Sequence, residues 1–387
     1  MNSDRPIRVA NIIEESKIGG PHIRMMSVAL NIDKNINTTI IIPQKNSEEF
    51  QKKLNKLKIK YFLFPLTTLR RNWLAILKYI IFFIFEVIIL AKFFKRQKFD
   101  IIHISGGCWQ YKGLLAAKLA GVKSVWHLND TFAPILIRKI FSYFSILADS
   151  FIYASYRTKK YYEKYVPLNK KYFLIQAPVD IKFYDPSKNF KLDKFFKKKY
   201  LNKKIIIGTV ANINPVKGLD VFLKAKKHLK SFNDNIIFLI VGSINKNQKN
   251  YYKYLLKVIK VNKIKNVYFL KFREDIRPLL KKFDIYVCSS NYEASPLSVW
   301  EAMSMGKAII STDVGDVRKF INNGKNGFII KPGDKIQLSK KIKDLILNPK
   351  IKKNFGRLAR KTAKEKLDLK ICIKLHLKAY KSILRKC

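Results

Sequence analysis

Two glutamates, Glu293 and Glu301, stand eight positions apart in the stretch NYEASPLSVWEAMSMGKAIIST, residues 291–312. Acidic residues are scarce in this chain, which has 27 of them against 78 lysines and arginines. Carboxylates accept hydrogen bonds, so two of them at a fixed spacing suit a ligand that carries several hydroxyl groups. The simpler alternative is one loop carboxylate and one solvated carboxylate on a helix.

The residues between the two glutamates predict the start of a helix. The run DIYVCSS before them has the character of a strand, and Ser295 followed by Pro296 is a typical N-cap and first-turn pair. The amides of Leu297 and Ser298 would then be unpaired donors at the positive end of the helix, which suits a diphosphate. Glu301 would share their face one turn further on, where a carboxylate can accept both hydroxyls of a ribose.

This arrangement predicts a site for a sugar nucleotide, with Glu293 in the loop facing the sugar. Lys217, in IIIGTVANINPVKGLD, would bring a positive charge to the phosphates from the opposite side, although most lysines of this chain are simply solvated. His127 ends the apolar run VKSVWHL, so it is either a hydrogen-bonded core histidine or a residue at the ligand-binding end of a strand. Asp130 could orient this histidine or cap the following turn.

The elements that would position these residues follow a regular pattern. Short apolar, β-branched runs alternate with helix-length segments, which indicates βα units on a parallel sheet. The first set of runs is IRVANII, TTIIIP, IKYFLFPL, DIIHIS, VKSVWHL, DSFIYAS and FLIQAP; the second is IIIGTV, IIFLIVG, VYFLKF, DIYVCSS, KAIIST and GFIIKPG. Runs that are apolar from end to end indicate strands covered on both faces.

We therefore predict an α/β fold of two Rossmann-like, doubly wound parallel-sheet domains that face a central cleft. The first domain takes residues 1–185 and the second takes residues 186–365. A last helical segment, about 351–385, is expected to cross back, so that a C-terminal helix of about 366–387 packs on the first domain. Ligands of such sheets bind at the carboxyl ends of the strands, where the candidate residues lie.

Together, SSNYEASPLSVWEAMSMGKAIISTDVGDV, VKGLDVFLKA and NNGKNGFIIKPGD resemble the large retaining family of GT-B glycosyltransferases that use nucleotide sugars, of the glycosyltransferase family 4 type. The resemblance covers nearly the whole chain. KIGGPHIRMMSVAL resembles the first glycine loop and helix of that family, FDIIHISGG its fourth strand, SVWHLND its histidine strand, and IQAPVDIKFYDP the segment that joins its domains. The resemblance implies transfer from a UDP- or GDP-linked sugar, with retention and without a metal ion or other cofactor.

The resemblance also assigns roles. It implies that Glu293 contacts the donor sugar, that Glu301 holds the ribose and that Lys217 binds the diphosphate. It places His127 near the reacting side of the sugar, so Glu293 and His127 are the candidate catalytic residues. The amides of the Gly19–Gly20 loop would approach phosphate and acceptor, although two glycines there could equally form a plain left-handed turn.

Two positions depart from the family pattern. Members usually carry an arginine five residues before the diphosphate lysine, whereas this chain has Asn212. Either the diphosphate is bound more weakly or another base replaces the arginine, for which Arg273 in LKFREDIRP is our candidate. Where the family often has two glycines and a following glutamate, this chain has Gly315–Asp316 and Lys319. The loop therefore does not identify the donor.

Composition limits the remaining classes of function. The formal net charge is +51, which raises the possibility of nucleic-acid binding, but lysine is spread along the chain together with much Ile and Asn, and no nucleic-acid-binding motif occurs. The four cysteines have neither disulfide nor zinc spacing, which fits a reducing cytosol, and no Asp-x-Asp pair or His/Asp cluster with ligand spacing indicates a metal. The N-terminus lacks the apolar core of a signal peptide.

The stretch WLAILKYIIFFIFEVIILAKFF, residues 73–94, is long enough to span a bilayer but is interrupted by Lys78, Glu86 and Lys92. With Arg71 these charges fall on about a third of the helix circumference, which leaves a broad apolar face. The helix therefore either lies in a membrane interface or is a buried helix of the first domain, and a full span is the weaker alternative.

These observations predict a glycosyltransferase at the cytosolic face of the cell membrane, peripherally bound, with a lipid-linked, polysaccharide or lipopolysaccharide acceptor. The alternatives are a sugar-nucleotide epimerase or hydrolase of the same architecture, which would consume donor without acceptor, and a basic nucleic-acid-binding protein.

Overall fold

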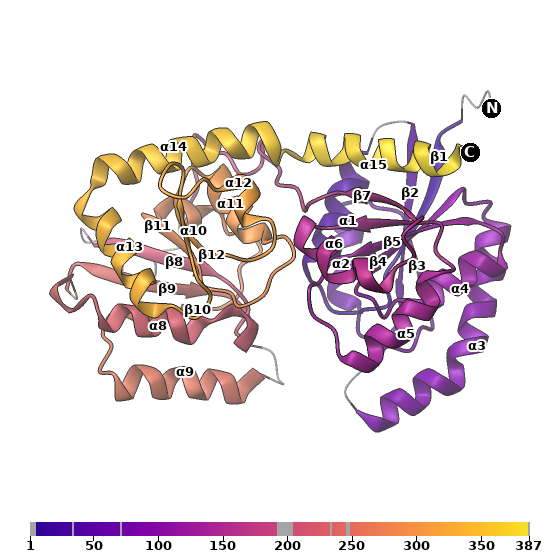
Figure 1. The fold of residues 1–387 in the computed structure, drawn as a ribbon, viewed down its shortest axis with the longest axis horizontal. Coiled ribbons are helices and arrows are strands. Elements are labelled where there is room, and N and C mark those ends of the chain that lie inside the picture. Colours follow the sequence, from indigo (N-terminus) through magenta and orange to yellow (C-terminus); the bar gives the residue numbers. More distant parts are fainter. Residues whose placement is uncertain are drawn as a thin grey trace. The chain divides into compact units, whose positions relative to one another are not determined.

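The computed structural model describes residues 5–32, 35–69, 72–191, 204–232, 234–244 and 248–385. Contacts divide the chain into two compact units (Figure 1). Unit 1 consists of Met1–Pro178 and Leu369–Cys387, and unit 2 is the continuous segment Val179–Asp368. The boundaries that the sequence analysis places at 185/186 and 365/366 both fall inside unit 2.

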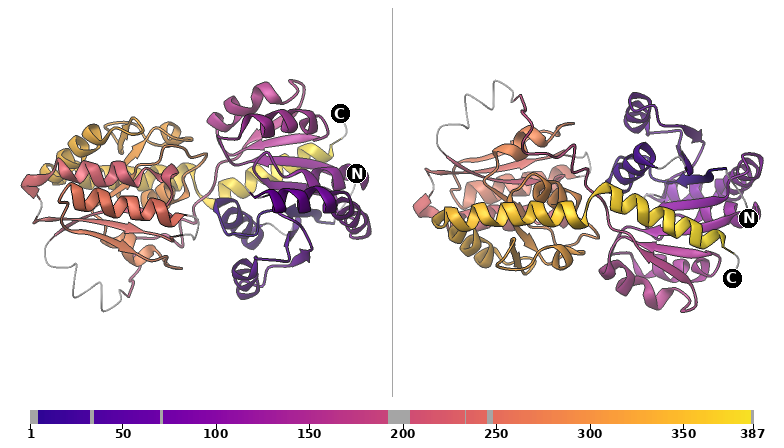
Figure 2. Two further views of the ribbon diagram at one scale, coloured as in Figure 1. Left: turned by 90° about the horizontal axis from the view of Figure 1, so that it is seen from below. Right: turned by 90° about the horizontal axis from the view of Figure 1, so that it is seen from above.

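Unit 1 is built on a seven-stranded sheet with the strand order β3-β2-β1-β4-β5-β6-β7, in which every pairing is parallel. Its strands are β1 (Ile7–Ile12), β2 (Ile36–Pro43), β3 (Tyr61–Phe64), β4 (Ile101–Gly106), β5 (Lys123–Leu128), β6 (Ser150–Tyr153) and β7 (Lys171–Leu174). Its helices are α1 (Gly20–Asn31), α2 (Glu48–Lys56), α3 (Trp73–Arg96), α4 (Tyr111–Leu119), α5 (Ile135–Ser145), α6 (Tyr156–Tyr162), the 3-10 turn η1 (Glu163–Tyr165) and α15 (Leu369–Leu384). One face of the sheet is covered by α3 to α6, and the other by α1, α2 and α15 (Figure 2).

Unit 2 repeats this plan with six parallel strands in the order β10-β9-β8-β11-β12-β13. Its strands are β8 (Ile205–Val210), β9 (Ile236–Val241), β10 (Val267–Leu270), β11 (Ile285–Cys288), β12 (Ala308–Thr312) and β13 (Phe328–Ile330). Its helices are η2 (Pro215–Lys217), α8 (Leu219–Lys227), η3 (Lys230–Phe232), α9 (Lys249–Val261), α10 (Arg277–Lys282), α11 (Leu297–Ser304), α12 (Val317–Phe320), α13 (Lys335–Leu347) and α14 (Pro349–Lys366). Helices α8, α9 and α13 pack on one face of this sheet, and α10, α11, α12 and α14 on the other (Figure 1).

The predicted fold class is confirmed, because each unit is a doubly wound parallel sheet and every strand overlaps one of the apolar runs, although β7 shares only Phe173 and Leu174 with FLIQAP. Strand β9 shows why these runs are apolar throughout: all six residues of IIFLIV are buried, since helices cover both faces. The last helical segment differs from the expectation. It is two helices, α14 in unit 2 and α15 in unit 1, and the break at 367–368 pairs with Val179, whose amide donates to the Leu367 carbonyl at 2.9 Å.

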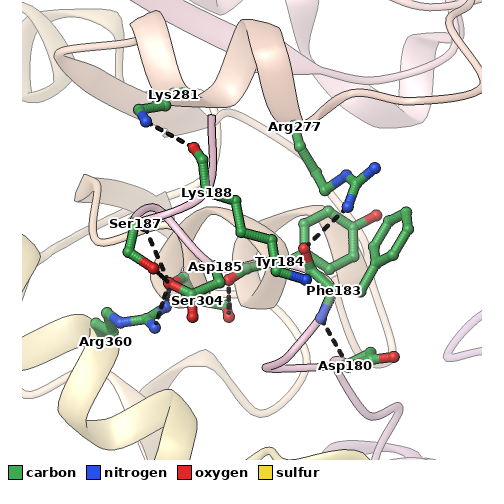
Figure 3. Close-up of polar contacts among 10 residues, drawn as sticks. All are labelled: Asp180, Phe183, Tyr184, Asp185, Ser187, Lys188, Arg277, Lys281, Ser304 and Arg360. Carbon is green, nitrogen blue, oxygen red and sulfur yellow. Dashed lines mark hydrogen bonds and ion pairs between the residues drawn. The ribbon is translucent and has the colours of Figure 1, made fainter. Parts of the chain in front are cut away.

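The segment after Pro178 belongs to unit 2 because polar contacts hold it there (Figure 3). Arg360 on α14 donates to the Asp185 carboxylate at 2.9 Å. The hydroxyl of Ser304 donates to the Tyr184 carbonyl at 2.7 Å. Arg277 stacks on the Phe183 ring, 3.5 Å from its centroid, and donates to the Phe183 carbonyl. This segment is therefore a structural part of unit 2, and it brings Tyr184 to the candidate site described below.

Helix α3 is long and apolar enough to cross a bilayer, but one side of it packs on unit 1. Only 28% of its most apolar window is buried, so it is not the buried core helix of the alternative prediction. Its exposed apolar residues run along most of the helix: Trp73, Leu74, Ile76, Leu77, Ile80, Ile81, Phe82, Ile84, Phe85, Ile88 and Ile89. The prediction that all the charged residues of this helix share one exposed face is wrong for Glu86, which is buried against the domain. Lys78 and Lys92 are exposed, and Arg71 lies outside the described residues.

Buried polar contacts attach α3 to the rest of unit 1. Glu86 on α3 forms an ion pair with Lys112 at 2.5 Å, and the two side chains are 4% and 0% exposed. The Lys112 ammonium also donates to the Thr67 carbonyl at 2.6 Å and lies 3.9 Å from the centroid of the Tyr79 ring. Tyr79, one more α3 residue, donates to Glu14 at the end of β1. A helix bound this way lies along the domain surface.

Removing the cation from this buried pair should be costly. Replacing Lys112 with Met leaves the buried Glu86 carboxyl without its ion-pair partner, and we expect a loss of roughly 3–5 kcal/mol in the free energy of unfolding. The double variant Lys112→Met/Glu86→Gln should recover at least half of that loss, because Gln keeps an acceptor for the Thr67 amide. Urea unfolding followed by tryptophan fluorescence measures both. A single variant within about 1 kcal/mol of the parent would contradict the role of the pair.

Candidate functional site

Helix α11 begins at the carboxyl edge of the unit 2 sheet, after the loop that leaves β11. It starts at Leu297 with Pro296 as N-cap, one residue later than predicted, because Ser295 does not cap it; the Ser295 hydroxyl accepts from Trp300 Nε1 at 3.1 Å instead. Hydrogen bonds of the first turn begin with the Val299 amide, so those of Leu297 and Ser298 have no acceptor within the helix. The predicted pair of amides therefore lies at the helix N-terminus.

Lys217 and Glu293 meet at this edge. The Lys217 ammonium donates to Glu293 Oε1 at 2.5 Å, and Ser290 Oγ donates to the same oxygen at 2.9 Å. Burial lowers the pKa of Lys217, but the charge and hydrogen bond of Glu293 raise it by more, so the net shift is upward and the ammonium stays protonated. The sequence analysis placed Lys217 at the phosphates and Glu293 at the sugar, and in the structure the two side chains are in direct contact.

Glu301 lies on α11, one turn below the helix N-terminus, and has a partner that the sequence did not reveal. The Tyr184 hydroxyl donates to Glu301 Oε1 at 2.8 Å. Burial raises the pKa of Glu301 from 4.5 to about 7, and the hydrogen bond from Tyr184 offsets part of that rise. Tyr184 contacts only this one carboxylate oxygen, so the second oxygen of Glu301 is suited to accept a hydrogen bond from a ligand hydroxyl.

Glycines allow the loops around Glu293 to approach closely. Gly218 has φ of 56°, and a Cβ atom there would lie 2.1 Å from the Ser289 carbonyl oxygen. Gly315 has φ of 52°, and its Cβ would lie 2.3 Å from the Ala294 carbonyl oxygen. The Ser289 hydroxyl donates in turn to the Lys217 carbonyl at 3.0 Å. The loops after β8, β11 and β12 are therefore in backbone contact, and a side chain at either glycine would force them apart.

The two other candidate diphosphate residues, Asn212 and Arg273, lie in the loops after β8 and β10. Asn212 is exposed at the end of β8, and its side-chain oxygen accepts from the Ser243 amide at 3.3 Å. Arg273 is exposed in the loop after β10, and β9 separates β10 from β8 in the sheet. Both residues lie at the carboxyl edge of the sheet. That Arg273 takes over the role of the arginine that the family carries at position 212 stays a prediction.

His127 is fully buried in β5 of unit 1 and belongs to a network of polar side chains. Arg24 Nη1 lies 2.5 Å from His127 Nδ1, and His103 Nε2 lies 3.1 Å from the same atom. Arg24 also approaches His376 Nε2 at 3.4 Å and donates to Ser105 Oγ at 2.8 Å. Burial and then the Arg24 charge and the neighbouring histidines hold the pKa of His127 well below its usual range. Among the described residues, His127 Nε2 has no hydrogen-bond partner.

Asp130 does not orient His127 directly. Its carboxylate accepts a hydrogen bond from the Tyr162 hydroxyl, and its other oxygen is buried without a partner among the described residues. Burial raises the pKa of Asp130 to about 7, an effect that this hydrogen bond only partly offsets. Its two predicted roles are thus replaced by a contact with α6.

The first glycine loop adopts a conformation different from the simple alternative. Gly19 is the N-cap of α1 with φ of −139° and ψ of −173°, and Gly20 has no positive φ, so the loop is not a left-handed turn. A Cβ atom at Gly19 would meet only Pro21 at 3.8 Å. The Gly19 amide donates to His22 Nδ1 at 3.3 Å. Among the described residues, no contact demands glycine at position 19, which is consistent with a requirement set by a ligand.

Three histidines that are distant in sequence, His103, His127 and His376, place ring nitrogens within 4.8 Å of one another. Sequence spacing could not reveal this cluster. Its chemistry does not suit a cation, because the Arg24 guanidinium already occupies the lone-pair side of His127 Nδ1 and His376 Nε2. A metal ion would have to displace a buried positive charge from both atoms.

Two family models match most of the chain. The model described as "Glycosyl transferases group 1" matches residues 190–362, and the model described as "Glycosyltransferase Family 4" matches residues 18–183. The two matches fall on unit 2 and unit 1, respectively.

Similar proteins match between 64% and 97% of the chain. The Campylobacter jejuni N,N'-diacetylbacillosaminyl-diphospho-undecaprenol alpha-1,3-N-acetylgalactosaminyltransferase is 25% identical over 380 residues, which is 94% of this chain and 96% of the relative. The Escherichia coli UDP-Gal:alpha-D-GlcNAc-diphosphoundecaprenol alpha-1,3-galactosyltransferase is 29% identical over 64% of this chain and 67% of its own length. The crystal structure of Anabaena HepE in complex with UDP and glucose has a TM-score of 0.83 at 19% identity, and the match covers 97% of this chain and all of HepE.

The raised pKa of Glu301 makes a prediction for stability. The Glu301 carboxyl keeps its proton up to about pH 7 in the folded protein but releases it near pH 4.5 in the unfolded chain. The contribution of Glu301 to the free energy of unfolding is therefore fully present below pH 4.5 and is lost as the pH rises through 7. Glu301→Gln cannot ionise and keeps an acceptor for Tyr184. From pH 5 to pH 8 its stability should therefore improve relative to the parent by on the order of 1–3 kcal/mol.

Thermal unfolding at pH 5, 6, 7 and 8 measures this difference. Glu365→Gln, at an exposed glutamate of α14, is the matched control and should track the parent at every pH. A Glu301→Gln curve parallel to the parent would show that the carboxyl is ionised throughout.

Proposed function

The chain belongs to the GT-B glycosyltransferases of the glycosyltransferase family 4 type, and we propose that it moves a sugar, with retention, from a nucleotide-sugar donor to a lipid-linked or polysaccharide acceptor. The observation that carries this proposal is the group at the carboxyl edge of unit 2. There Lys217 and Glu293 are in contact, and Glu301 follows the N-terminus of α11 by one turn. Retention rests on the family resemblance.

The geometry of unit 2 supports the binding of a nucleoside diphosphate. The amides of Leu297 and Ser298 are donors at the positive end of α11, where phosphate oxygens bind. Lys217 adds a full positive charge beside the same loop. We propose that the free oxygen of Glu301 accepts ribose hydroxyls and that Glu293, released from part of its contact with Lys217, accepts a hydroxyl of the donor sugar. Each role uses an acceptor or donor that the site already presents.

Departure of the diphosphate is the chemical step that these groups assist. Negative charge grows on the leaving phosphate, and fixed dipoles and cations aimed at that charge lower the barrier because they need no reorganisation. The α11 N-terminus and Lys217 provide such groups, so in this proposal the leaving diphosphate is stabilised without a metal ion. His127 is proposed to bind an oxygen of the substrate.

The donor site is tested by thermal unfolding with UDP, GDP, CDP and ADP, in EDTA and in Mg²⁺. A ligand present at a hundred times its dissociation constant adds roughly 2.7 kcal/mol of stability. One diphosphate should stabilise the parent and Glu365→Ala, but neither Glu301→Ala nor Lys217→Met. Stabilisation that survives both site variants would place the nucleotide elsewhere, and dependence on Mg²⁺ would refute the metal-free step.

We propose that the acceptor is a sugar on a polyprenyl diphosphate or a growing envelope polysaccharide, bound at the cytosolic membrane face. Both relatives described above carry diphospho-undecaprenol in their names. The exposed apolar side of α3 supports a membrane location, because a contiguous apolar helix face with lysines at its edges suits the bilayer interface. The net charge of +51 favours an anionic surface. Nucleic acid is not part of this proposal.

Substitutions on the exposed side of α3 test membrane binding. Ile80, Ile84 and Phe85 are 65%, 60% and 67% exposed, so changing all three to Gln removes apolar area without touching the core. We expect the variant to remain in the supernatant when the parent sediments with vesicles of anionic lipid, while nucleotide stabilisation is unchanged. Val261→Gln/Ile351→Gln, at exposed positions of unit 2, is the control that should still sediment. A triple variant that sediments like the parent contradicts α3 as the anchor.

A further inference from the structure

The network around His127 permits a single assignment of protons. Arginine is always a donor, so the lone pair of His127 Nδ1 must face Arg24 Nη1, and the proton of the neutral ring must lie on Nε2. His103 Nε2 approaches the same lone pair at 3.1 Å, so it must donate as well. His103 Nδ1 is then an acceptor, and it receives the Tyr380 hydroxyl at 2.6 Å.

The contacts of His376, the third histidine of the cluster, are consistent with these tautomers of His127 and His103. His376 Nδ1 lies 2.9 Å from the Cys372 carbonyl oxygen, which can only accept, so the His376 proton is on Nδ1. Its Nε2 lone pair then faces Arg24 Nη1 at 3.4 Å. Burial lowers the pKa of His376 to about 3, so this ring is neutral too. All three rings are thus uncharged, and each tautomer follows from its neighbours.

Arg24 is an unusual centre for such a network. It is fully buried on α1, and its partners are the histidines and Ser105; among the described residues no carboxylate is within hydrogen-bond distance of it. Burial lowers the pKa of Arg24 to about 10, so it is charged at physiological pH. A buried cation without an anion destabilises a fold, because neutral acceptors only partly offset the cost of removing the charge from water. Folding alone therefore gives no reason for an arginine here.

We propose that Arg24 is a positioning residue that fixes His127 as the neutral Nε2–H tautomer, so that it presents one N–H donor to an uncharged oxygen of the substrate. Arg24 acts directly on His127 Nδ1, and Tyr380 fixes only the tautomer of the neighbouring His103. The orphaned buried Nε2 is the donor that this arrangement leaves for a ligand. The identity of that ligand rests on the proposed function, but the tautomer does not.

The same contacts determine how the network responds to pH. The charged and titratable groups that face His127 are Arg24 from α1, His103 from β4 and His376 from α15, and Tyr380 of α15 contacts His103 and His376 behind them. Arg24 is the only one of these that carries a charge near neutrality. His127 should therefore not titrate between pH 5 and pH 8, and an N–H donor remains available over that whole range.

Selective ¹⁵N labelling of histidine tests the proposal on the ligand-free protein, which has only five histidines. We expect His127 to show a protonated Nε2 and an unprotonated Nδ1 from pH 5 to pH 8. In Arg24→Met, Nδ1 loses its cationic donor, so both tautomers should appear and the pKa should rise, while the melting temperature stays equal or increases. A parent with the proton on Nδ1, or an Arg24→Met variant with an unchanged tautomer, overturns the proposal.

Tyr380→Phe provides a second variant that removes a single oxygen atom. It should change the tautomer of His103 to a mixture and leave that of His127 unchanged, because Arg24 still faces Nδ1. Two controls lie in unit 1 outside the network: Arg138→Met on α5 and Tyr153→Phe on β6 should alter neither ring. A His103 tautomer that is unaffected in Tyr380→Phe would show that the Tyr380 hydroxyl does not fix this ring.

Failure of the proposed function gives a different result. If His127 has the predicted tautomer but His127→Ala transfers sugar as fast as the parent, the substrate role is wrong and the positioning network still holds. If the tautomer is wrong, the network fails whatever the activity.

Discussion

The candidate site of unit 2 depends on one ion pair. Lys217 leaves β8 through a short 3-10 turn, and Glu293 leaves β11 through an irregular loop, so neither is held by regular structure. Their 2.5 Å contact joins the two loops, and Gly218 lets the backbones meet behind it. Helix α11 starts from the second of these loops. The direction in which its first amides point is thus set by this ion pair together with the Ser289 hydroxyl, which donates to the Lys217 carbonyl at 3.0 Å, and the Asn291 amide, which donates to the Val216 carbonyl at 2.7 Å.

In unit 1, by contrast, the polar residues of the candidate site lie buried inside the fold. Arg24, His127 and Ser105 come from α1, β5 and β4, and α15 closes the group from a distant part of the chain. Every contact of Arg24 there is with a neutral acceptor, so the charge is solvated by dipoles and not by a counter-ion. An arrangement of this kind keeps a histidine uncharged, whereas a carboxylate in place of the arginine would favour its protonation.

Sequence patterns predicted the architecture well, because a strand buried on both faces must be apolar at every position, as β9 is. The local features of α11 were also predictable from Pro296 and the spacing of Glu293 and Glu301, apart from the exact first residue. Contacts between distant segments were not. Tyr184 carries no local signal for a partner more than a hundred positions away, and the burial of Glu86 depends on Lys112, which no helical periodicity can show.

The order in which the chain enters and leaves the two units has a consequence for biosynthesis. All strands and helices of unit 2 lie in one uninterrupted segment, so this half can fold while the ribosome is still adding the residues that follow. Unit 1 cannot be completed until α15 has been made. Until then, α15 does not cover the side of α1 that carries Val28, or His103 of β4 and His127 of β5. The first half to be translated is therefore the last to complete its fold. For most of its synthesis, the nascent chain exposes apolar surface both on α3 and on the part of unit 1 that α15 later covers. Chaperones that recognise such surface would meet this protein chiefly through its earliest residues.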